Sequence, residues 1–358
     1  MNRLNKQTRS MLLNAAFIVG TFALVVFLTV RSGEIVLAWK AIRSLDLRWI
    51  GGAIGCFCVY AFGEGFLIHV FFLQQKVKIR LSDSVLVGLI GMFYSAITPS
   101  ATGGQPMQVF ALKKRNVPIG ISTSALAVKF FNWQCALLIS GAVMWVAHPS
   151  LVRVNVDQIV WIVFLGFFVN SLAVVGVLLL AINKNIVRAI IVFIVRFAHK
   201  LRIVKELERT SSHVDAALDD FHASVDMLKH HPVRMLLLLL LSFIQVISFT
   251  SVIFCIYRSF GLNTNTYGDL VTLQFILYIG ASMTPLPGGS GAQEGGFYLF
   301  FQQIFPQGTL IGALLIWRFI TYYLSIIVGL VGVTVNSALS IRQHRDEKNG
   351  ESVKPDQD

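Results

Sequence analysis

The stretch Thr284-Pro-Leu-Pro-Gly-Gly-Ser-Gly-Ala-Gln-Glu-Gly-Gly296 interrupts an otherwise apolar part of the chain, and a shorter counterpart, Thr98-Pro-Ser-Ala-Thr-Gly-Gly-Gln-Pro106, lies in the first half. Both begin with Thr-Pro and reach a Gly-Gly pair. Proline removes a backbone hydrogen-bond donor and glycine weakens a helix, so each stretch is expected to interrupt a helix. Inside a membrane, such backbone is tolerated only where protein buries it or where it lines a water-filled cavity. A matched pair of broken segments therefore indicates a transport site.

The composition places the chain in a membrane. Hydrophobic residues make up 55% of the 358 residues and charged residues 13%, whereas a soluble domain has about 25% charged residues. The net charge of +12 comes from basic residues in loops beside apolar segments, where they indicate topology rather than nucleic-acid binding. No P-loop, Ser-His-Asp arrangement or metal-spaced Cys/His cluster is present. We therefore predict an all-α integral membrane protein without a catalytic residue, metal or cofactor.

The apolar runs predict about six transmembrane helices and two re-entrant hairpins, one around each broken stretch. The helices are expected at residues 11–30, 49–73, 119–147, 159–182, 233–257 and 309–336. The first run is too long for the core of a signal peptide, so we expect a retained span. The apolar spacing from Leu207 to Leu228 predicts an amphipathic helix in the only sizeable polar region.

Three spans separate the two hairpins, so the second hairpin is expected to be inverted relative to the first. The predicted organisation is a first transmembrane helix with an interfacial segment at 1–48, repeat 1 at 49–147, a linking helix with a cytoplasmic amphipathic region at 148–232, repeat 2 at 233–340 and a disordered tail at 341–358. The distribution of Lys and Arg among the loops favours cytoplasmic termini at both ends.

Two cations occupy matching places in the two repeats. Lys129 lies 31 residues after Thr98, and Arg318 lies 34 residues after Thr284. An intramembrane cation costs about 2.5–3.5 kcal/mol on insertion scales, so each needs an anionic partner. Two kinds of partner remain open: Glu64 and Glu294 within the protein, or a lipid phosphate held between the cations and by free N–H groups at the helix breaks.

The candidate site residues follow from these observations. The predicted headgroup-binding residues are Lys129, Arg318, Glu64, Glu294, Gln293, Asn132 and Tyr322. The predicted hairpin residues are Thr98, Pro99, Gly103, Gly104, Gln105, Thr284, Pro285, Pro287, Gly288, Gly289 and Gly291. The glycines are expected to let the hairpins approach a headgroup and each other.

The first broken stretch with Lys113-Lys114-Arg115 after it, and the second stretch through Glu294, resemble the lysylphosphatidylglycerol synthase transmembrane family, whose best-known member is the bacterial multiple peptide resistance factor. The resemblance covers nearly all of the chain, and the second motif is the more specific. It implies a flippase-like domain that moves aminoacylated phosphatidylglycerol to the outer leaflet of the bacterial inner membrane, where the lipid repels cationic antimicrobial peptides. In that family a separate cytoplasmic domain attaches lysine from lysyl-tRNA. The sequence ends at Asp358 before such a domain, so we do not expect an enzyme in this chain by itself.

The prediction is a transporter with a membrane lipid as its substrate and no nucleic-acid partner. One alternative is a lipid-modifying enzyme: a phosphatidylglycerol lysyltransferase, or the membrane subunit of one that works with a separate synthase chain. Another is a transporter of a hopanoid or polyprenyl-linked lipid, and a third is a small-solute or ion transporter. A lipid site requires a lateral opening between spans for the acyl chains, whereas a solute site would be enclosed by protein. The sequence indicates no oligomeric state.

Overall fold

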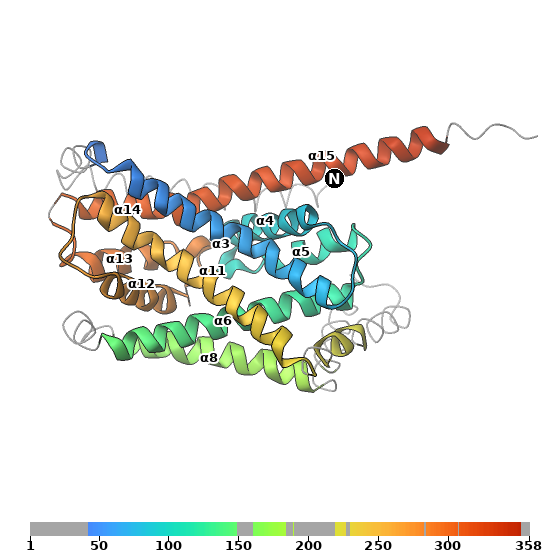
Figure 1. Cartoon of the computed structure of the whole chain (residues 1–358), viewed down its shortest axis with the longest axis horizontal. Helices are drawn as coiled ribbons and strands as arrows, with labels where there is room; N and C mark the ends of the chain where they lie inside the picture. Colours follow the sequence, from blue (N-terminus) through green and yellow to red (C-terminus); the bar gives the residue numbers. More distant parts are fainter. Residues whose placement is uncertain are drawn as a thin grey trace, which may run out of the picture.

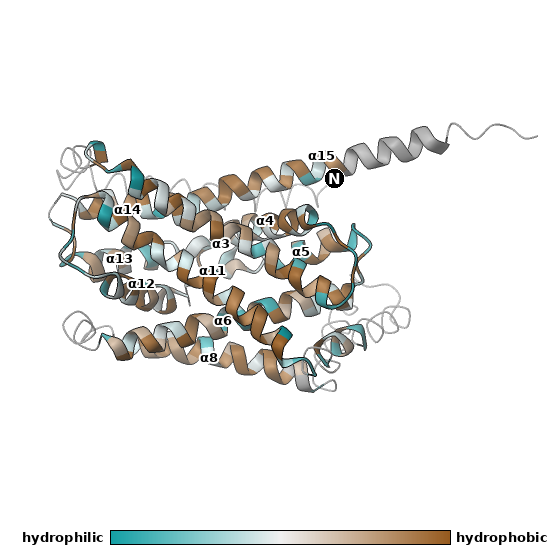
Figure 2. Cartoon of the chain, viewed as in Figure 1, coloured by the Kyte–Doolittle hydropathy of each residue, from teal (hydrophilic) through white to brown (hydrophobic). Residues whose placement is uncertain are grey.

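The computed structural model describes residues 42–148, 160–183, 189, 219–226, 230–282, 284–306 and 308–351. Within these ranges every regular element is a helix, and none is a strand. The helices form an elongated bundle whose long members run from one end to the other (Figure 1). Hydrophobic residues predominate along these helices (Figure 2). The prediction of an all-α membrane protein is confirmed.

Four helices in the described ranges are long and apolar enough to cross a membrane. They are α3 (Leu47–Gln74), α6 (Ile119–Ala147), α11 (Pro232–Ser259) and the helix Leu310–Leu339, which combines α14 (Leu310–Arg318), the π-helical turn η3 (Phe319–Tyr323) and the start of α15 (Leu324–Glu351). A shorter apolar helix, α8 (Val160–Ile182), packs against α6 and α12. These five match five of the predicted spans, and the sixth, at 11–30, lies outside the described residues.

The first predicted hairpin is present. It consists of α4 (Leu81–Ile97), the turn η1 (Pro99–Ala101) and α5 (Gly104–Lys113). Gly91 of α4 faces Gln108 of α5, and further from the turn Asp83 pairs with Arg115 at 2.8 Å. Because these pairs lie at equal distances on the two sides of the turn, α5 runs back along α4 toward the end where α4 began.

The second hairpin points the opposite way. It consists of α12 (Tyr267–Ala281), the turn η2 (Pro287–Gly289) and α13 (Ala292–Phe301). Its arms also run back along each other, since a Cβ on Gly296 would lie 2.4 Å from Leu277. The turns η1 and η2 contact each other, while the open ends of the two hairpins lie at opposite ends of the bundle (Figure 1). The broken stretches therefore meet in the interior.

Small residues allow the helices around hairpin 1 to pack closely. A Cβ on Gly65 of α3 would lie 2.3 Å from the Cα of Val85 in α4, so the two backbones touch at this point. Gly329 and Gly332 of α15 face the other side of α4, where a Cβ would meet Phe93 or Leu89 at less than 3 Å. Membrane helices use small residues in this way because no hydrophobic effect drives them together in lipid. The first hairpin (residues 81–113, hairpin 1) therefore packs through α4 between α3 and α15.

Helix α15 extends further than expected. We predicted a disordered tail at 341–358, whereas the backbone is helical to Glu351, and residues 352–358 lie outside the described ranges. The segment is rich in Arg, Gln, Glu and Lys, which are good helix formers, so it can continue a helix that packing has already nucleated. The predicted amphipathic helix at 207–228 is described only at residues 219–226.

Candidate functional site

A cavity of about 1170 Å³ is lined by residues of both predicted repeats. Ser100 in η1 and Gly288 in η2 bring both turns to its wall, and α3, α6, α11 and α12 contribute further side chains. Lys129 and Arg318 both lie on this wall. Ligand pockets usually measure about 300–1,000 Å³, so the cavity is large enough for a sizeable ligand. Among the described residues, no cluster of His, Cys, Asp and Glu is placed to hold a metal ion.

Lys129 forms an ion pair with Glu64 across the interface of α6 and α3. Its Nζ lies 2.5 Å from Glu64 Oε2, and the side chains are 14% and 15% exposed. The other carboxylate oxygen of Glu64 accepts a hydrogen bond of 2.9 Å from Nε2 of Gln245 in α11. That amide also donates to the backbone oxygen of Tyr60 at 3.1 Å. Three helices therefore hold this pair in one orientation.

Arg318 pairs with Glu294 of hairpin 2 and is more deeply buried, with side chains that are 7% and 13% exposed. Its Nε lies 2.5 Å from Glu294 Oε1, and its Nη2 donates to the oxygen of Gly288 at 2.9 Å and to Ser290 Oγ at 3.2 Å. Glu294 Oε2 accepts from the backbone N of Gly291 at 2.6 Å. Both cations thus have a carboxylate of the protein as partner, which is one of the two arrangements that the sequence left open.

Tyr322 connects the two turns. Its hydroxyl donates to the backbone oxygen of Ala96, at the end of α4, at 3.1 Å. Its ring lies 4.6 Å from the Arg318 guanidinium and covers Gly288, where a Cβ would approach the ring to 2.1 Å. Gly288 also has a φ of 61°, a conformation that glycine adopts without strain. This position therefore requires glycine for two independent reasons.

The predicted site residues divide into two groups. Those on the cavity wall are Lys129, Arg318, Glu64, Gln293, Tyr322, Gln105, Thr284, Gly288 and Gly289. Those away from it are Asn132, Glu294, Thr98, Pro99, Gly103, Gly104, Pro285, Pro287 and Gly291. Gln293 is 7% exposed, and its Oε1 has no hydrogen-bond partner among the described residues.

Residues away from the wall make hydrogen bonds within their own segments. Thr98 Oγ1 donates to the oxygen of Tyr94 at 2.6 Å and accepts from the N of Gly103 at 2.9 Å, which closes the turn of hairpin 1. Asn132 donates to the oxygen of Val128 one helical turn earlier. Thr98 and Asn132 therefore stabilise the local backbone and do not contact the cavity.

Other residues on the wall were missed in the sequence. Asn170 of α8 accepts from Gln134 of α6 at 2.8 Å and donates to Ser282 at the end of α12 at 2.8 Å. Asn170 and Gln245 are isolated amides within long apolar runs, which is a signal that could have identified them, since such side chains commonly hydrogen-bond between membrane helices. Four aromatic residues, Tyr60, Trp133, Phe249 and Tyr278, also line the cavity, but aromatics are too common in apolar spans to stand out.

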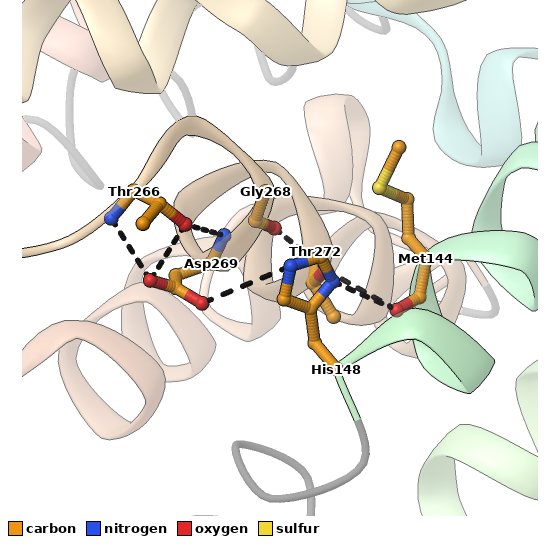
Figure 3. Close-up of polar contacts among 6 residues, drawn as sticks. All are labelled: Met144, His148, Thr266, Gly268, Asp269 and Thr272. Atoms are coloured by element: carbon orange, nitrogen blue, oxygen red, sulfur yellow. Dashed lines mark hydrogen bonds and ion pairs between the residues drawn. The ribbon is translucent and has the colours of Figure 1, made fainter.

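The outer end of hairpin 2 is anchored to α6 by a separate polar cluster (Figure 3). His148, directly after α6, lies 4.0 Å from Asp269 and 3.3 Å from the Oγ1 of Thr272, both in α12. Asp269 also accepts from the N of Thr266 at 2.8 Å and completes the capping box that begins α12. These residues do not line the cavity, so the cluster fixes the base of the hairpin and leaves the turn free of this constraint.

Comparison with known proteins agrees with the sequence motifs. Residues 11–329 match the family model described as the lysylphosphatidylglycerol synthase TM region. The chain is also similar to a protein of Archaeoglobus fulgidus described as a UPF0104 membrane protein, with 26% identity over 316 residues that cover 83% of this chain and 89% of the relative. The family match includes both hairpins and both ion pairs. The chain therefore belongs to the family of the lysylphosphatidylglycerol synthase transmembrane region.

Proposed function

We propose that this protein translocates a phospholipid between the two leaflets of a membrane. The observation that carries the proposal is the cavity of about 1170 Å³ whose wall includes both oppositely directed turns and both intramembrane cations. Paired broken helices of inverted orientation are a recurrent way to build a substrate site near the midplane. Polar groups on such a wall would replace the water that a headgroup loses when it leaves the membrane surface.

The two ion pairs favour a polar substrate over an apolar one. An isolated charge in the membrane is costly, but Lys129 and Arg318 are each compensated by a carboxylate of the protein. Each ion pair offers strong hydrogen-bonding groups but has no net charge. The pairs therefore do not create a strong electrostatic attraction that would hold a headgroup in place. Aminoacylated phosphatidylglycerol, a lipid of the kind that the family name mentions, is the substrate that the family suggests, and its export would reduce binding of cationic antimicrobial peptides.

The proposal includes a location in the bacterial inner membrane with both termini in the cytoplasm. Basic side chains gather at the bundle end that carries the open end of hairpin 1, and they are Lys76, Lys78, Arg80, Lys113, Lys114 and Arg115. Loops rich in Lys and Arg stay on the cytoplasmic side. A fluorescent protein that matures only in the cytoplasm, fused after residue 358, should be bright; a dark fusion with full-length expression would contradict the orientation.

The test is a leaflet-resolved lipid assay in proteoliposomes with two matched substitutions on α6. Ala127 lines the cavity, whereas Ala142 is exposed on the outside of the same helix. Ala127→Trp should occupy part of the cavity and slow lipid exchange at least about tenfold, and Ala142→Trp should exchange lipid at the rate of the unmodified chain. Exchange no faster than in protein-free liposomes for the unmodified chain, or equal rates for the two variants, would refute the proposal.

A further inference from the structure

Four aromatic rings from four different helices gather on the cavity wall. They belong to Tyr60 of α3, Trp133 of α6, Phe249 of α11 and Tyr278 of α12. Neighbouring ring centroids are 4.8 Å apart for Tyr60 and Phe249, 5.8 Å for Tyr60 and Trp133, and 5.4 Å for Phe249 and Tyr278. None of the four is fully buried, so part of each ring faces the cavity. Because they come from both repeats, the cluster exists only when the two halves are assembled.

A carboxylate lies beside this aromatic cluster. Glu64 follows Tyr60 by one helical turn on α3, and Gln245 contacts both the Glu64 carboxylate and the Tyr60 backbone oxygen. Among the described residues on the cavity wall, Glu64 is the only acidic side chain. Aromatic faces carry partial negative charge and attract ammonium groups, and a neighbouring carboxylate strengthens that attraction. The same arrangement repels an anion, and an apolar ligand would gain nothing from the carboxylate.

The cation next to Glu64 retains capacity for an anionic group. An ammonium has three N–H donors, and Lys129 has one hydrogen-bond partner in the described structure, Glu64. Arg318 differs, because its Nε and Nη2 hold Glu294, Gly288 and Ser290 in place and its side chain is only 7% exposed, against 14% for Lys129. A phosphate on the cavity wall would therefore meet Lys129 more readily than Arg318, which serves to fix the turn of hairpin 2.

These observations define a site for a zwitterion. The Lys129–Glu64 pair is neutral as a whole, so a ligand of net charge would leave an uncompensated charge within the membrane, which is costly. A ligand with one ammonium and one phosphate can lie antiparallel to the pair, with its ammonium against Glu64 and the rings and its phosphate against Lys129. Each charge then gains an opposite neighbour while the total stays zero.

We propose that the aromatic cluster and Glu64 form an ammonium subsite, and that the cavity takes a zwitterionic phospholipid headgroup with its phosphate at Lys129. This inference rests on the proposed lipid translocation and narrows its substrate class. Phosphatidylethanolamine has the required chemistry. Phosphatidylglycerol lacks the ammonium, and lysyl-phosphatidylglycerol has a second ammonium for which the described wall offers no further carboxylate.

The first experiment compares headgroups in the leaflet-resolved assay with the full chain. Labelled phosphatidylethanolamine should exchange faster than phosphatidylglycerol or lysyl-phosphatidylglycerol. Trp133→Leu should slow phosphatidylethanolamine by about 3- to 30-fold, the range expected for one cation–π contact, and slow phosphatidylglycerol clearly less. Phe168→Leu, on the exposed outer face of α8, is the matched control and should change neither rate. Equal rates for all headgroups, or a Trp133→Leu variant that slows every lipid alike, would overturn the subsite while lipid translocation stands.

The second experiment measures binding separately from transport. Dihexanoyl phosphatidylethanolamine should raise the unfolding temperature of the purified protein more than dihexanoyl phosphatidylglycerol, and Trp133→Leu should abolish the difference. This preference without any lipid exchange would refute translocation and support the subsite. Equal shifts for the two lipids would overturn the subsite. Glycerophosphoethanolamine is the soluble comparison, and a shift as large as that of the lipid would overturn the assignment to a membrane lipid.

Discussion

The buried pair formed by Arg318 and Glu294 gives the sharpest test of how hairpin 2 is held. Replacing Arg318 by Met keeps an unbranched side chain but removes the cation and its three hydrogen bonds. Glu294, whose side chain is 13% exposed, would keep only the backbone N of Gly291. The first turn of α13 would then contain a carboxylate without a countercharge.

The expected loss can be worked out from this geometry. Breaking a buried ion pair by removing one partner costs about 3–5 kcal/mol, because the remaining charge is uncompensated. With an unfolding entropy of about 2.1 cal/mol/K for each of the 358 residues, that corresponds to a decrease of about 4–7 °C in unfolding temperature. In the double variant Arg318→Met/Glu294→Gln no charge remains, but the Gly288 carbonyl still lacks its donor, which costs about 1–3 kcal/mol. The double variant should therefore be more stable than Arg318→Met alone.

Thermal unfolding of the four proteins in one detergent, followed by loss of the monodisperse chromatographic peak, measures this cycle. Asp83→Asn is the control, because the Asp83–Arg115 pair lies at the outer end of hairpin 1 and Asp83 is 30% exposed. Its loss should be about 1 kcal/mol or less. The reasoning fails if the stability losses of Arg318→Met and Glu294→Gln simply add in the double variant. It also fails if Arg318→Met lowers the unfolding temperature no more than Asp83→Asn does.

Three further changes test other contacts. Gly65→Ala should cost about 1–3 kcal/mol, because its Cβ would overlap the α4 backbone; unchanged thermal stability would contradict the close α3–α4 packing. Thr266→Ala removes the cap shared with Asp269 and should cost about 1 kcal/mol, with faster amide exchange confined to the start of α12; uniform exchange would argue against a local cap. Tyr322→Phe removes only the hydrogen bond to Ala96 and should cost about 0.5–1.5 kcal/mol, and a neutral result in the same unfolding assay would remove its role as a link between the turns.

The two hairpins could be predicted from the sequence because their signals are local. Thr-Pro and Gly-Gly act on the backbone wherever they occur, and the similar placement of Lys129 and Arg318, 31 and 34 residues after the two Thr-Pro pairs, indicated a repeat. Local sequence signals did not decide which group pairs with each cation. The sequence offered Glu64 and Glu294 as partners but favoured a lipid phosphate, whereas the structure pairs Glu64 with Lys129 and Glu294 with Arg318.

The rest of the site depends on contacts between distant segments. Gln245 bonds Glu64 across 181 residues, and the aromatic cluster takes one ring from each of four helices. The pattern of residues within one helix does not predict these contacts, because the spans are apolar on all sides and their sequence does not show which face is buried. The helical tail was missed for a different reason: its charged residues suggested disorder, although their helix propensity is high.

The π-helical turn η3 has a consequence for how related chains should be compared. An α-helix rotates by about 100° per residue, and a π turn accommodates one extra residue without breaking the span. The turn η3 lies between Arg318, which faces hairpin 2, and Gly329 and Gly332, which face hairpin 1. The extra residue therefore changes the rotation of the first part of the span relative to the second. Deleting a single residue there would leave length and hydropathy almost unchanged but turn one of these faces toward lipid. Homologues that look equivalent by hydropathy can therefore differ in whether their last span joins both halves.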